Sequence, residues 1–162
     1  MLSLTRKSDY ALVALVSLAE RPDELQSARE LADRLNLPQA ALRNILKDLT
    51  RSGMLDSIQG TSGGYRLARD ASDISLADVI QVIEGPVRLT TCCSTDTAPE
   101  SEGCRREDGC RIKATVRGIN QRLSDFLTTV SLAELAREAI QHREQSPVTL
   151  VGLDTQPHGA TA

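Results

Sequence analysis

Residues 27–53 carry the signals of two helices joined by a tight turn, and this pair constrains the fold more than any other feature of the 162-residue chain. Ser27 and Glu30 form the capping box that opens the first helix. Pro38 fits the first position of the second helix, and Gly53 suits its C-terminal cap. The apolar stripe of the second helix is formed by Leu42, Ile45, Leu46 and Leu49. Two helices in this arrangement predict a helix-turn-helix unit.

A glycine-rich β-hairpin is expected directly after the second helix. Short strand-like runs cover residues 55–58 and 65–67, and the six residues between them include three glycines. An earlier amphipathic helix is expected over residues 4–20, and a later one, opened by another capping box, over residues 76–84. This order of elements predicts a mainly α-helical chain with a small β-hairpin, a winged helix-turn-helix domain over residues 1–86.

A long helix is expected from about residue 112 to residue 129. Its apolar seam recurs at alternating spacings of three and four and consists of Val116, Ile119, Leu123, Phe126 and Val130. A seam of about two heptads favours one helix–helix contact, either within the core or between the two subunits of a homodimer. The predicted organisation is therefore a winged domain over 1–86, a cysteine loop over 87–113, a dimerisation helix with a short last helix over 114–144, and a flexible tail over 145–162.

Charge is distributed unevenly along this weakly acidic chain, whose formal net charge is −3. Residues 37–69 hold five basic and only two acidic side chains, which suits a partner with phosphates as well as an ordinary solvated surface. A hydrophobic fraction of 40% excludes global disorder. No apolar run approaches the length of a membrane span, and the N-terminus is a poor signal peptide. We therefore expect a cytoplasmic protein without membrane contacts.

The second helix of a helix-turn-helix unit is the one that enters the major groove of DNA. Its outward face carries long polar side chains here, and arginine pairs bidentately with guanine and asparagine with adenine. The hairpin would form a wing whose glycines let the backbone approach phosphates. The expected DNA-binding residues are Gln39, Arg43, Asn44, Lys47, Gln59, Gly60, Gly63, Gly64, Tyr65 and Arg66. A helical hairpin used only for packing is the alternative, but helix order, local charge and hairpin agree on double-stranded DNA.

Four cysteines lie within nineteen residues: Cys92, Cys93, Cys104 and Cys110. In a reducing cytosol such a cluster indicates metal or redox chemistry more than structural disulfides. The spacing is not that of a zinc ribbon, which has two close Cys-x-x-Cys pairs. Three separated thiolates on a glycine-containing loop can surround an iron–sulfur cluster. Structural zinc, a regulatory disulfide, or cysteines without a site remain open alternatives.

Four motifs are spread along about residues 1–140. Residues 4–11 read LTRKSDYA, and residues 63–67 of the hairpin read GGYRL. Residues 80–92 contain EGP and end in the first cysteine, and residues 131–135 read SLAEL. Together these motifs resemble the Rrf-type winged-helix transcription regulators, which include the iron–sulfur regulator IscR and the nitric-oxide-sensitive repressor NsrR. The third motif looks most like the branch that regulates the Suf iron–sulfur assembly system.

The resemblance implies a homodimer that binds palindromic promoter DNA, and an iron–sulfur cluster, [2Fe-2S] or [4Fe-4S], that controls DNA affinity. By position in the family, the ligand cysteines are Cys92, Cys104 and Cys110, and Cys93 is an extra neighbour that could replace Cys92. The position of the IscR histidine ligand holds Lys113, which is protonated at neutral pH and is a poor ligand.

The fourth ligand and the operator preference are the points where this chain departs from IscR. In NsrR-like proteins the fourth ligand is an aspartate near the N-terminus of the partner subunit, and Asp9 occupies the matching position. An ordinary first-turn aspartate favoured by the helix dipole is the alternative. The loop before Cys104 is longer than in IscR, and Gln59 stands where IscR has a basic residue, which argues against an identical operator preference.

The expected function is transcription regulation in response to iron–sulfur or redox status, with the genes of cluster assembly as targets. Rival interpretations are a regulator whose cysteines form a thiol–disulfide switch without iron, and a nitric-oxide-sensing repressor. A cluster-carrying scaffold that does not bind DNA is a third, which the basic segment argues against. The sequence shows no paired catalytic constellation, so we do not expect an enzyme.

Overall fold

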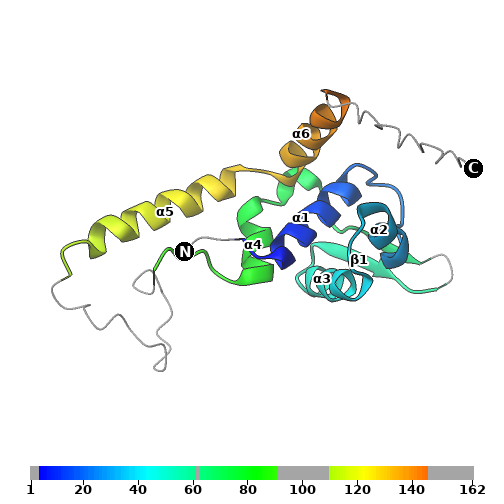
Figure 1. The fold of residues 1–162 in the computed structure, drawn as a ribbon, viewed down its shortest axis with the longest axis horizontal. Coiled ribbons are helices and arrows are strands. Elements are labelled where there is room, and N and C mark those ends of the chain that lie inside the picture. Colours follow the sequence, from blue (N-terminus) through cyan, green and yellow to red (C-terminus); the bar gives the residue numbers. More distant parts are fainter. Residues whose placement is uncertain (1–3, 61–62, 91–109, 146–162) are drawn as a thin grey trace, which may run out of the picture.

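A computed structural model describes residues 4–60, 63–90 and 110–145 of the chain, with side chains up to residue 142. The described elements follow the order α1 (Arg6–Ala19), α2 (Ala28–Leu35), α3 (Gln39–Arg51), β1 (Leu55–Ile58), β2 (Gly64–Leu67), η1 (Ala71–Asp73), α4 (Leu76–Glu84), α5 (Lys113–Thr129) and α6 (Leu132–Gln145). Figure 1 shows a body of short helices with a hairpin at one side and the long helix α5 extending from the other. The predicted fold class, mainly helical with a small hairpin, is confirmed.

The helix-turn-helix signals are those that the sequence predicts, with one shift at the second helix. Ser27 and Glu30 form the capping box of α2, and Asn36 ends that helix in the left-handed conformation at φ 52°. Pro38 has extended backbone angles and is the N-cap of α3, one position before the helix rather than within it. Pro38 therefore still needs no N–H, because the first amides of a helix have no intrahelical partner.

The wing is a two-stranded antiparallel hairpin in which Leu55 pairs with Leu67 and Ile58 with Gly64. Gln26, just before α2, extends this sheet through two backbone hydrogen bonds with Tyr65, of 3.0 and 2.9 Å. A Cβ atom on Gly64 would lie 2.8 Å from the Gln26 backbone, so only glycine allows this approach. The hairpin is therefore fixed to the start of α2 as well as to the end of α3.

The core is aliphatic and joins α1, α2, α3 and α4. Its fully buried members include the predicted stripe of α3, together with Leu15 and Leu18 from α1, Leu31 from α2 and Val79 from α4. The start of α6 is held to the start of α4 by backbone hydrogen bonds of 2.8 Å from Leu132 to Ile74 and from Leu76 to Val130. These bonds, and the packing of α6 on α1, fix the end of α5 to the body.

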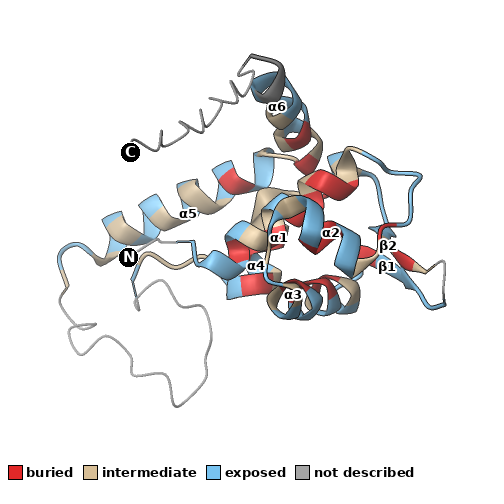
Figure 2. Ribbon diagram, turned by 45° about the vertical axis from the view of Figure 1, so that its right-hand side comes forward, coloured by how far each residue is buried: buried red, intermediate tan, exposed pale blue. Residues whose placement is uncertain are grey.

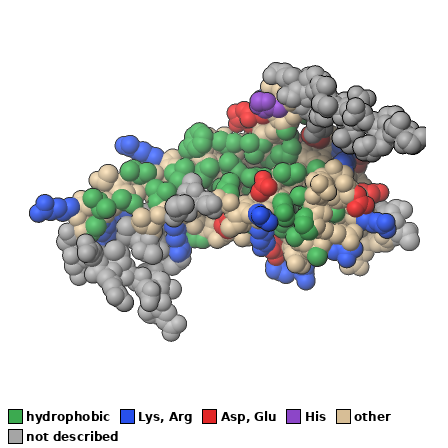
Figure 3. All heavy atoms as spheres, in the orientation of Figure 1, with side chains coloured by type: hydrophobic (Ala, Val, Ile, Leu, Met, Phe, Trp, Pro, Cys, Tyr) green, Lys and Arg blue, Asp and Glu red, His purple; other side chains and the backbone are tan. Residues whose placement is uncertain are grey.

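Helix α5 projects from the body and buries little of itself. Leu127 is its one buried residue among those described, whereas Ile119 and Phe126 of the predicted seam are 51% and 60% exposed. Figure 2 shows this contrast with the buried residues of the body, and Figure 3 shows hydrophobic side chains gathered along α5 and over the adjoining surface. The seam is thus not a stripe of the core in this chain.

The last described helix is longer than the sequence predicts. The sequence predicts a short last helix over residues 131–140, but α6 continues to Gln145, because the polar residues after Ile140 also favour a helix. Residues 146–162 of the expected tail and most of the loop expected over 87–113 lie outside the described residues, and the proposed domain boundaries stay predictions. No helix in the described ranges is long and apolar enough to cross a membrane.

Candidate nucleic-acid interface and cysteine segment

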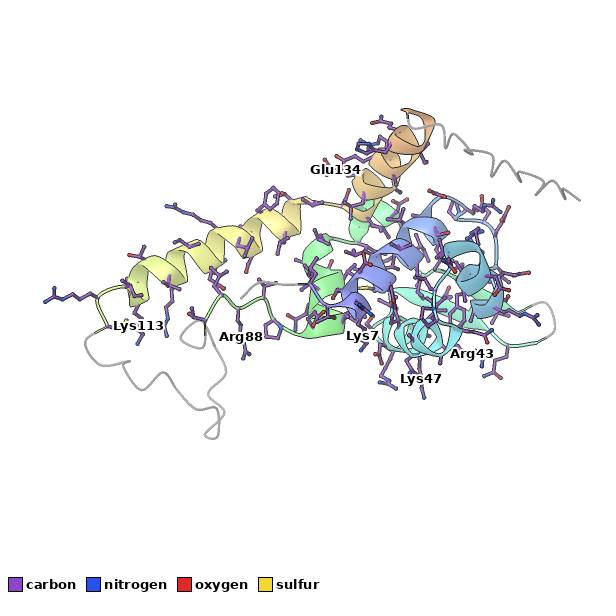
Figure 4. All side chains as sticks on the ribbon, in the orientation of Figure 1. Lys7, Arg43, Lys47, Arg88, Lys113 and Glu134 are labelled. Atoms are coloured by element: carbon purple, nitrogen blue, oxygen red, sulfur yellow. The ribbon has the colours of Figure 1, made fainter. Side chains whose placement is uncertain are left out.

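The outward face of α3 carries three of the predicted DNA-binding side chains in exposed positions. Arg43, Asn44 and Lys47 are all exposed, whereas Gln39 at the first position of the helix is half-buried. Within the described part of the chain, Arg43 and Lys47 make no ion pair. Figure 4 shows both side chains pointing away from the body on the same side of α3. Two unpaired cations one helical turn apart can meet phosphates or base edges without first breaking an internal contact.

A hollow of about 510 Å³ separates this face of α3 from the hairpin. Arg43, Asn44, Lys47 and Tyr65, all predicted from the sequence, contribute to its lining. The structure adds four residues that the sequence interpretation missed: Ala28, Thr50, Arg51 and Ser57. Arg51 follows Lys47 by four residues, so helical spacing alone could have indicated it. Ser57 and Ala28 come from other elements, and no local pattern indicates them.

The glycines of the hairpin, expected to let the backbone approach phosphates, differ in their surroundings. Gln59 and Gly60 are exposed, but Gly64 is buried, and a Cβ atom on Gly63 would lie 2.1 Å from the Ile58 carbonyl oxygen. Gly63 thus allows close packing within the hairpin, and Gly64 allows the close approach of the Gln26 backbone. Arg66 is exposed and lies 3.5 Å from Asp56 on the opposite strand, so part of its charge is neutralised within the wing.

Asp48 is the acidic residue at the edge of the basic face. Lys7 donates a 2.9 Å hydrogen bond to its carboxylate, and the Arg51 guanidinium lies 3.5 Å from it. The Lys7 hydrogen bond, with the nearby positive charges, lowers the pKa of Asp48 below its ordinary value. Asp48 is therefore ionised at neutral pH and removes one positive charge from the surface that α3 presents.

The first turn of α1 is held to the last residue of α4. Glu84 Oε1 accepts hydrogen bonds from the hydroxyl of Ser8 at 2.6 Å, from the backbone N–H of Thr5 at 3.2 Å, and from the Thr5 hydroxyl. Ser8 is fully buried. The hydrogen bonds from Ser8 and then Thr5 lower the pKa of Glu84. Asp9, the proposed fourth cluster ligand, lies in the same turn with its side chain exposed.

The described part of the cysteine segment consists of its two ends. Asn120 of α5 binds the outgoing chain: its Oδ1 accepts from the Leu89 N–H at 2.9 Å, and its Nδ2 donates to the Val87 carbonyl at 3.3 Å. On the C-terminal side of the segment, the described chain begins again at Cys110, three residues before α5. Cys110 is a half-buried free thiol, and Lys113 is the first residue of α5.

Cys92, Cys93 and Cys104 lie outside the described residues, and the residues that are described contain no group of three His, Cys, Asp or Glu side chains able to hold a metal ion. Figures 1 and 2 both show the start of α5 well separated from the start of α1 within one chain.

Comparison with known proteins decides the family. The family model Rrf2, described as an iron-dependent transcriptional regulator, matches residues 4–138. The chain belongs to the Rrf2 family. It is 37% identical over 114 residues to an rrf2-like HTH-type regulator of Rhodobacter capsulatus, covering 68% of this chain and 76% of that protein. It is 31% identical to the HTH-type transcriptional regulator IscR of Xenorhabdus nematophila, over 83% of this chain and 79% of that protein.

Solved structures show the same fold. CymR, the global cysteine regulator of B. subtilis, matches with a TM-score of 0.65 and 26% identity over 85% of this chain and 98% of that one. The T. potens IscR structure matches with a TM-score of 0.67 and 24% identity over 88% and 91%. The predicted resemblance is confirmed: this Rrf2 chain is a winged-helix transcription regulator of a DNA-binding family, and it is not an enzyme.

Proposed function

We propose that this Rrf2 protein acts as a homodimer that binds palindromic promoter DNA through α3 and the hairpin, and that an iron–sulfur cluster on its cysteine segment controls the affinity. The observation that carries the proposal is the unpaired basic face of α3 beside the hairpin. Arg43 and Lys47 are exposed there, they form no ion pair within the described residues, and they line the same hollow as Tyr65 of the wing.

The shape of this face supports insertion into a major groove. The buried stripe of α3 faces the core, so its polar residues project together on the other side. Arg43 and Asn44 are the residues proposed to read bases, and Lys47 and Arg51 the residues proposed to neutralise phosphates. The residues proposed to contact the DNA backbone, from the N-terminus of α3 and from the wing, are Gln39, Gln59, Gly60, Gly63, Gly64, Tyr65 and Arg66. Each neutralised phosphate releases counterions, so binding should weaken steeply with salt.

The exposed seam of α5 supports the homodimer. Ile119 and Phe126 expose large apolar side chains on this projecting helix, and Ile112 does so just before its first residue. Covering an apolar stripe of this kind with a second helix is favourable because it removes apolar surface from water. We propose that a second copy of α5 does this symmetrically, in a dimer whose two copies of α3 would meet half-sites about 34 Å apart.

The residues proposed to hold the cluster are Cys92, Cys104 and Cys110, with Asp9 supplied by the partner subunit. The described members suit this role chemically: Cys110 is a free thiol at the base of α5, and Asp9 is an exposed carboxylate. A ligand from the other subunit agrees with the separation between the starts of α1 and α5 in one chain. When bound, the cluster would supply a centre that gains or loses iron, or is oxidised, with cellular status.

We propose that the protein acts in the cytoplasm and controls the genes of iron–sulfur cluster assembly.

Selection from random DNA tests the DNA-binding part of the proposal and requires no known promoter. Wild-type protein is mixed with randomised duplexes several turns long, and the bound duplexes are amplified and sequenced. We expect enrichment of a two-fold symmetric site. No enriched sequence at low salt, with protein that is folded by circular dichroism, would contradict the proposal.

A thiol–disulfide switch on the same DNA-binding fold is the second candidate. Cys110 is free in the described structure, Cys92 and Cys93 are adjacent, and one structural neighbour is a cysteine regulator by name. Mass spectrometry of air-oxidised, iron-free protein distinguishes a disulfide switch from control by a cluster. Defined disulfides that abolish DNA binding, and that dithiothreitol reverses, would favour the switch over the cluster.

A further inference from the structure

We propose that Glu84 is a positioning residue: it fixes the winged domain at one angle to the dimer helix α5 and thereby sets the spacing between DNA half-sites that the dimer accepts. The inference rests on the proposed DNA-binding homodimer. It concerns residues that no part of the DNA-contact or cluster proposals uses.

The first step is the contact between Glu84 and α1. One carboxylate oxygen of Glu84 accepts from the Thr5 backbone, from the Thr5 hydroxyl and from Ser8. Ser8 is fully buried, so its hydroxyl has no access to water as an alternative acceptor. The carboxylate also lies at the positive end of the α1 dipole. The end of α4 and the start of α1 are therefore held in one arrangement.

The second step leads from Glu84 to the dimer helix. Gly85 follows at φ 87° and ends α4, and within five residues the chain reaches Asn120 of α5. Asn120 binds this chain through both atoms of its amide, to Val87 and Leu89. The segment between Glu84 and Leu89 is thus held at both ends, by α1 on one side and by α5 on the other.

The third step leads from α1 to the recognition helix. Lys7 lies between Thr5 and Ser8 in sequence and donates to Asp48 of α3 at 2.9 Å. Side-chain hydrogen bonds thus connect α5, the end of α4, the start of α1 and the outer face of α3.

The expected consequence is a change in half-site spacing rather than a simple loss of affinity. In a two-fold dimer, a small rotation of each winged domain about α5 moves the two copies of α3 in opposite directions. Each base pair added between half-sites rotates and shifts one half-site relative to the other, so a rigid dimer accepts one spacing. A dimer without the Glu84 contact should accept several.

The experiment uses full-length dimer and the symmetric site obtained by DNA selection, rebuilt as a series with one base pair removed or added between the half-sites. Binding is measured for wild type, Glu84→Ala, Glu84→Gln and Ser8→Ala. Glu24→Gln is the matched control, since Glu24 is an exposed glutamate that pairs with Arg21 at the other end of α1. Thermal unfolding of each variant identifies losses due to folding alone.

We expect wild type and Glu24→Gln to prefer one spacing by about tenfold or more, a difference of about 1.4 kcal/mol. Glu84→Ala and Ser8→Ala should reduce that preference to about threefold or less, and Glu84→Gln should retain most of it because its amide oxygen can still accept. If Glu84→Ala is unstable, Ser8→Ala supplies the same test. Unchanged spacing profiles in folded Ser8→Ala and Glu84→Ala would overturn this inference but leave the proposed function standing. A wild type that binds no duplex would overturn the proposed function and this inference with it.

Discussion

Lys7 of α1 and Asp48 of α3 are joined by a 2.9 Å hydrogen bond between oppositely charged groups, forty-one residues apart in sequence. The contact links the helix that carries the proposed ligand Asp9 to the helix proposed to read DNA. It also places an acidic side chain at the edge of a basic face, where Asp48 is shared between Lys7 and Arg51. Asp48 therefore moderates the charge that this face offers to phosphates.

The first prediction concerns that moderating charge. Asp48→Asn should release Lys7 and Arg51 and strengthen binding to DNA of arbitrary sequence several-fold at low salt, with a steeper dependence of affinity on salt, because one more positive charge becomes available. The half-exposed pair contributes at most about 1 kcal/mol to folding, so the variant should remain folded. Fluorescence anisotropy with a random-sequence duplex over a salt series measures both effects. Unchanged or weaker binding would contradict the placement of Asp48 beside the DNA.

The second prediction separates base reading from phosphate contact on α3. Arg43→Ala should weaken binding to the selected site by about tenfold or more, a loss of about 1–3 kcal/mol, and relax preference at one base pair. Lys47→Ala should weaken binding to all sequences and reduce the salt slope by about 1. Arg137→Ala, an exposed arginine of α6, serves as the control and should bind as wild type does. Equal behaviour of all three variants would remove α3 from the interface.

The third prediction concerns the seam of α5. Phe126→Glu places a charge on an exposed apolar position, so the monomer should fold normally while the dimer dissociation constant rises by about a hundredfold or more. Gln121→Glu, at an exposed polar position on the opposite side of the same helix, is the control. Sedimentation velocity over a concentration series measures the change. A Phe126→Glu protein that sediments as wild type would mean that this face of α5 is not the dimer contact.

The fourth prediction is a pH dependence of stability. The hydrogen bonds from Ser8 and Thr5 lower the pKa of Glu84, so the unfolded chain takes up this proton at higher pH than the folded chain does. The stabilisation is therefore fully present at neutral pH and is lost as pH falls from about 5 downward through the lowered pKa. The free-energy difference between wild type and Glu84→Gln, from urea unfolding, should shrink over that range. A difference that is constant with pH would contradict an ionised Glu84 in this contact.

Local patterns in the sequence predict most helices and their caps. Ser27 with Glu30 and Ser75 with Asp78 form the expected capping boxes, because each box depends only on residues three positions apart. The leucine stripe of α3 is buried as predicted, since one face of an amphipathic helix has a single apolar side to bury.

Contacts between segments that are distant in the sequence could not be predicted from such local patterns. No periodicity indicates that Gln26 pairs with Tyr65, or that Gly64 is glycine because the Gln26 backbone lies against it. Glu84 is an ordinary polar residue at a helix end in the sequence, and only the fold places Thr5 and Ser8 around it. The basic face of α3 was predictable for the same reason as its apolar face, but the contribution of Ser57 depends on how the hairpin packs.

The most direct test of whether this Rrf2 chain carries a cluster is the analysis of anaerobically purified protein. Its iron and acid-labile sulfide contents and its visible absorption spectrum are measured. We predict iron and sulfide in similar amounts and a coloured protein, with the spectrum lost in Cys110→Ser, altered in Asp9→Ala and unchanged in Cys93→Ser. A colourless protein that holds zinc, or no metal, even after reconstitution with iron and sulfide would contradict the cluster and leave the thiol–disulfide switch.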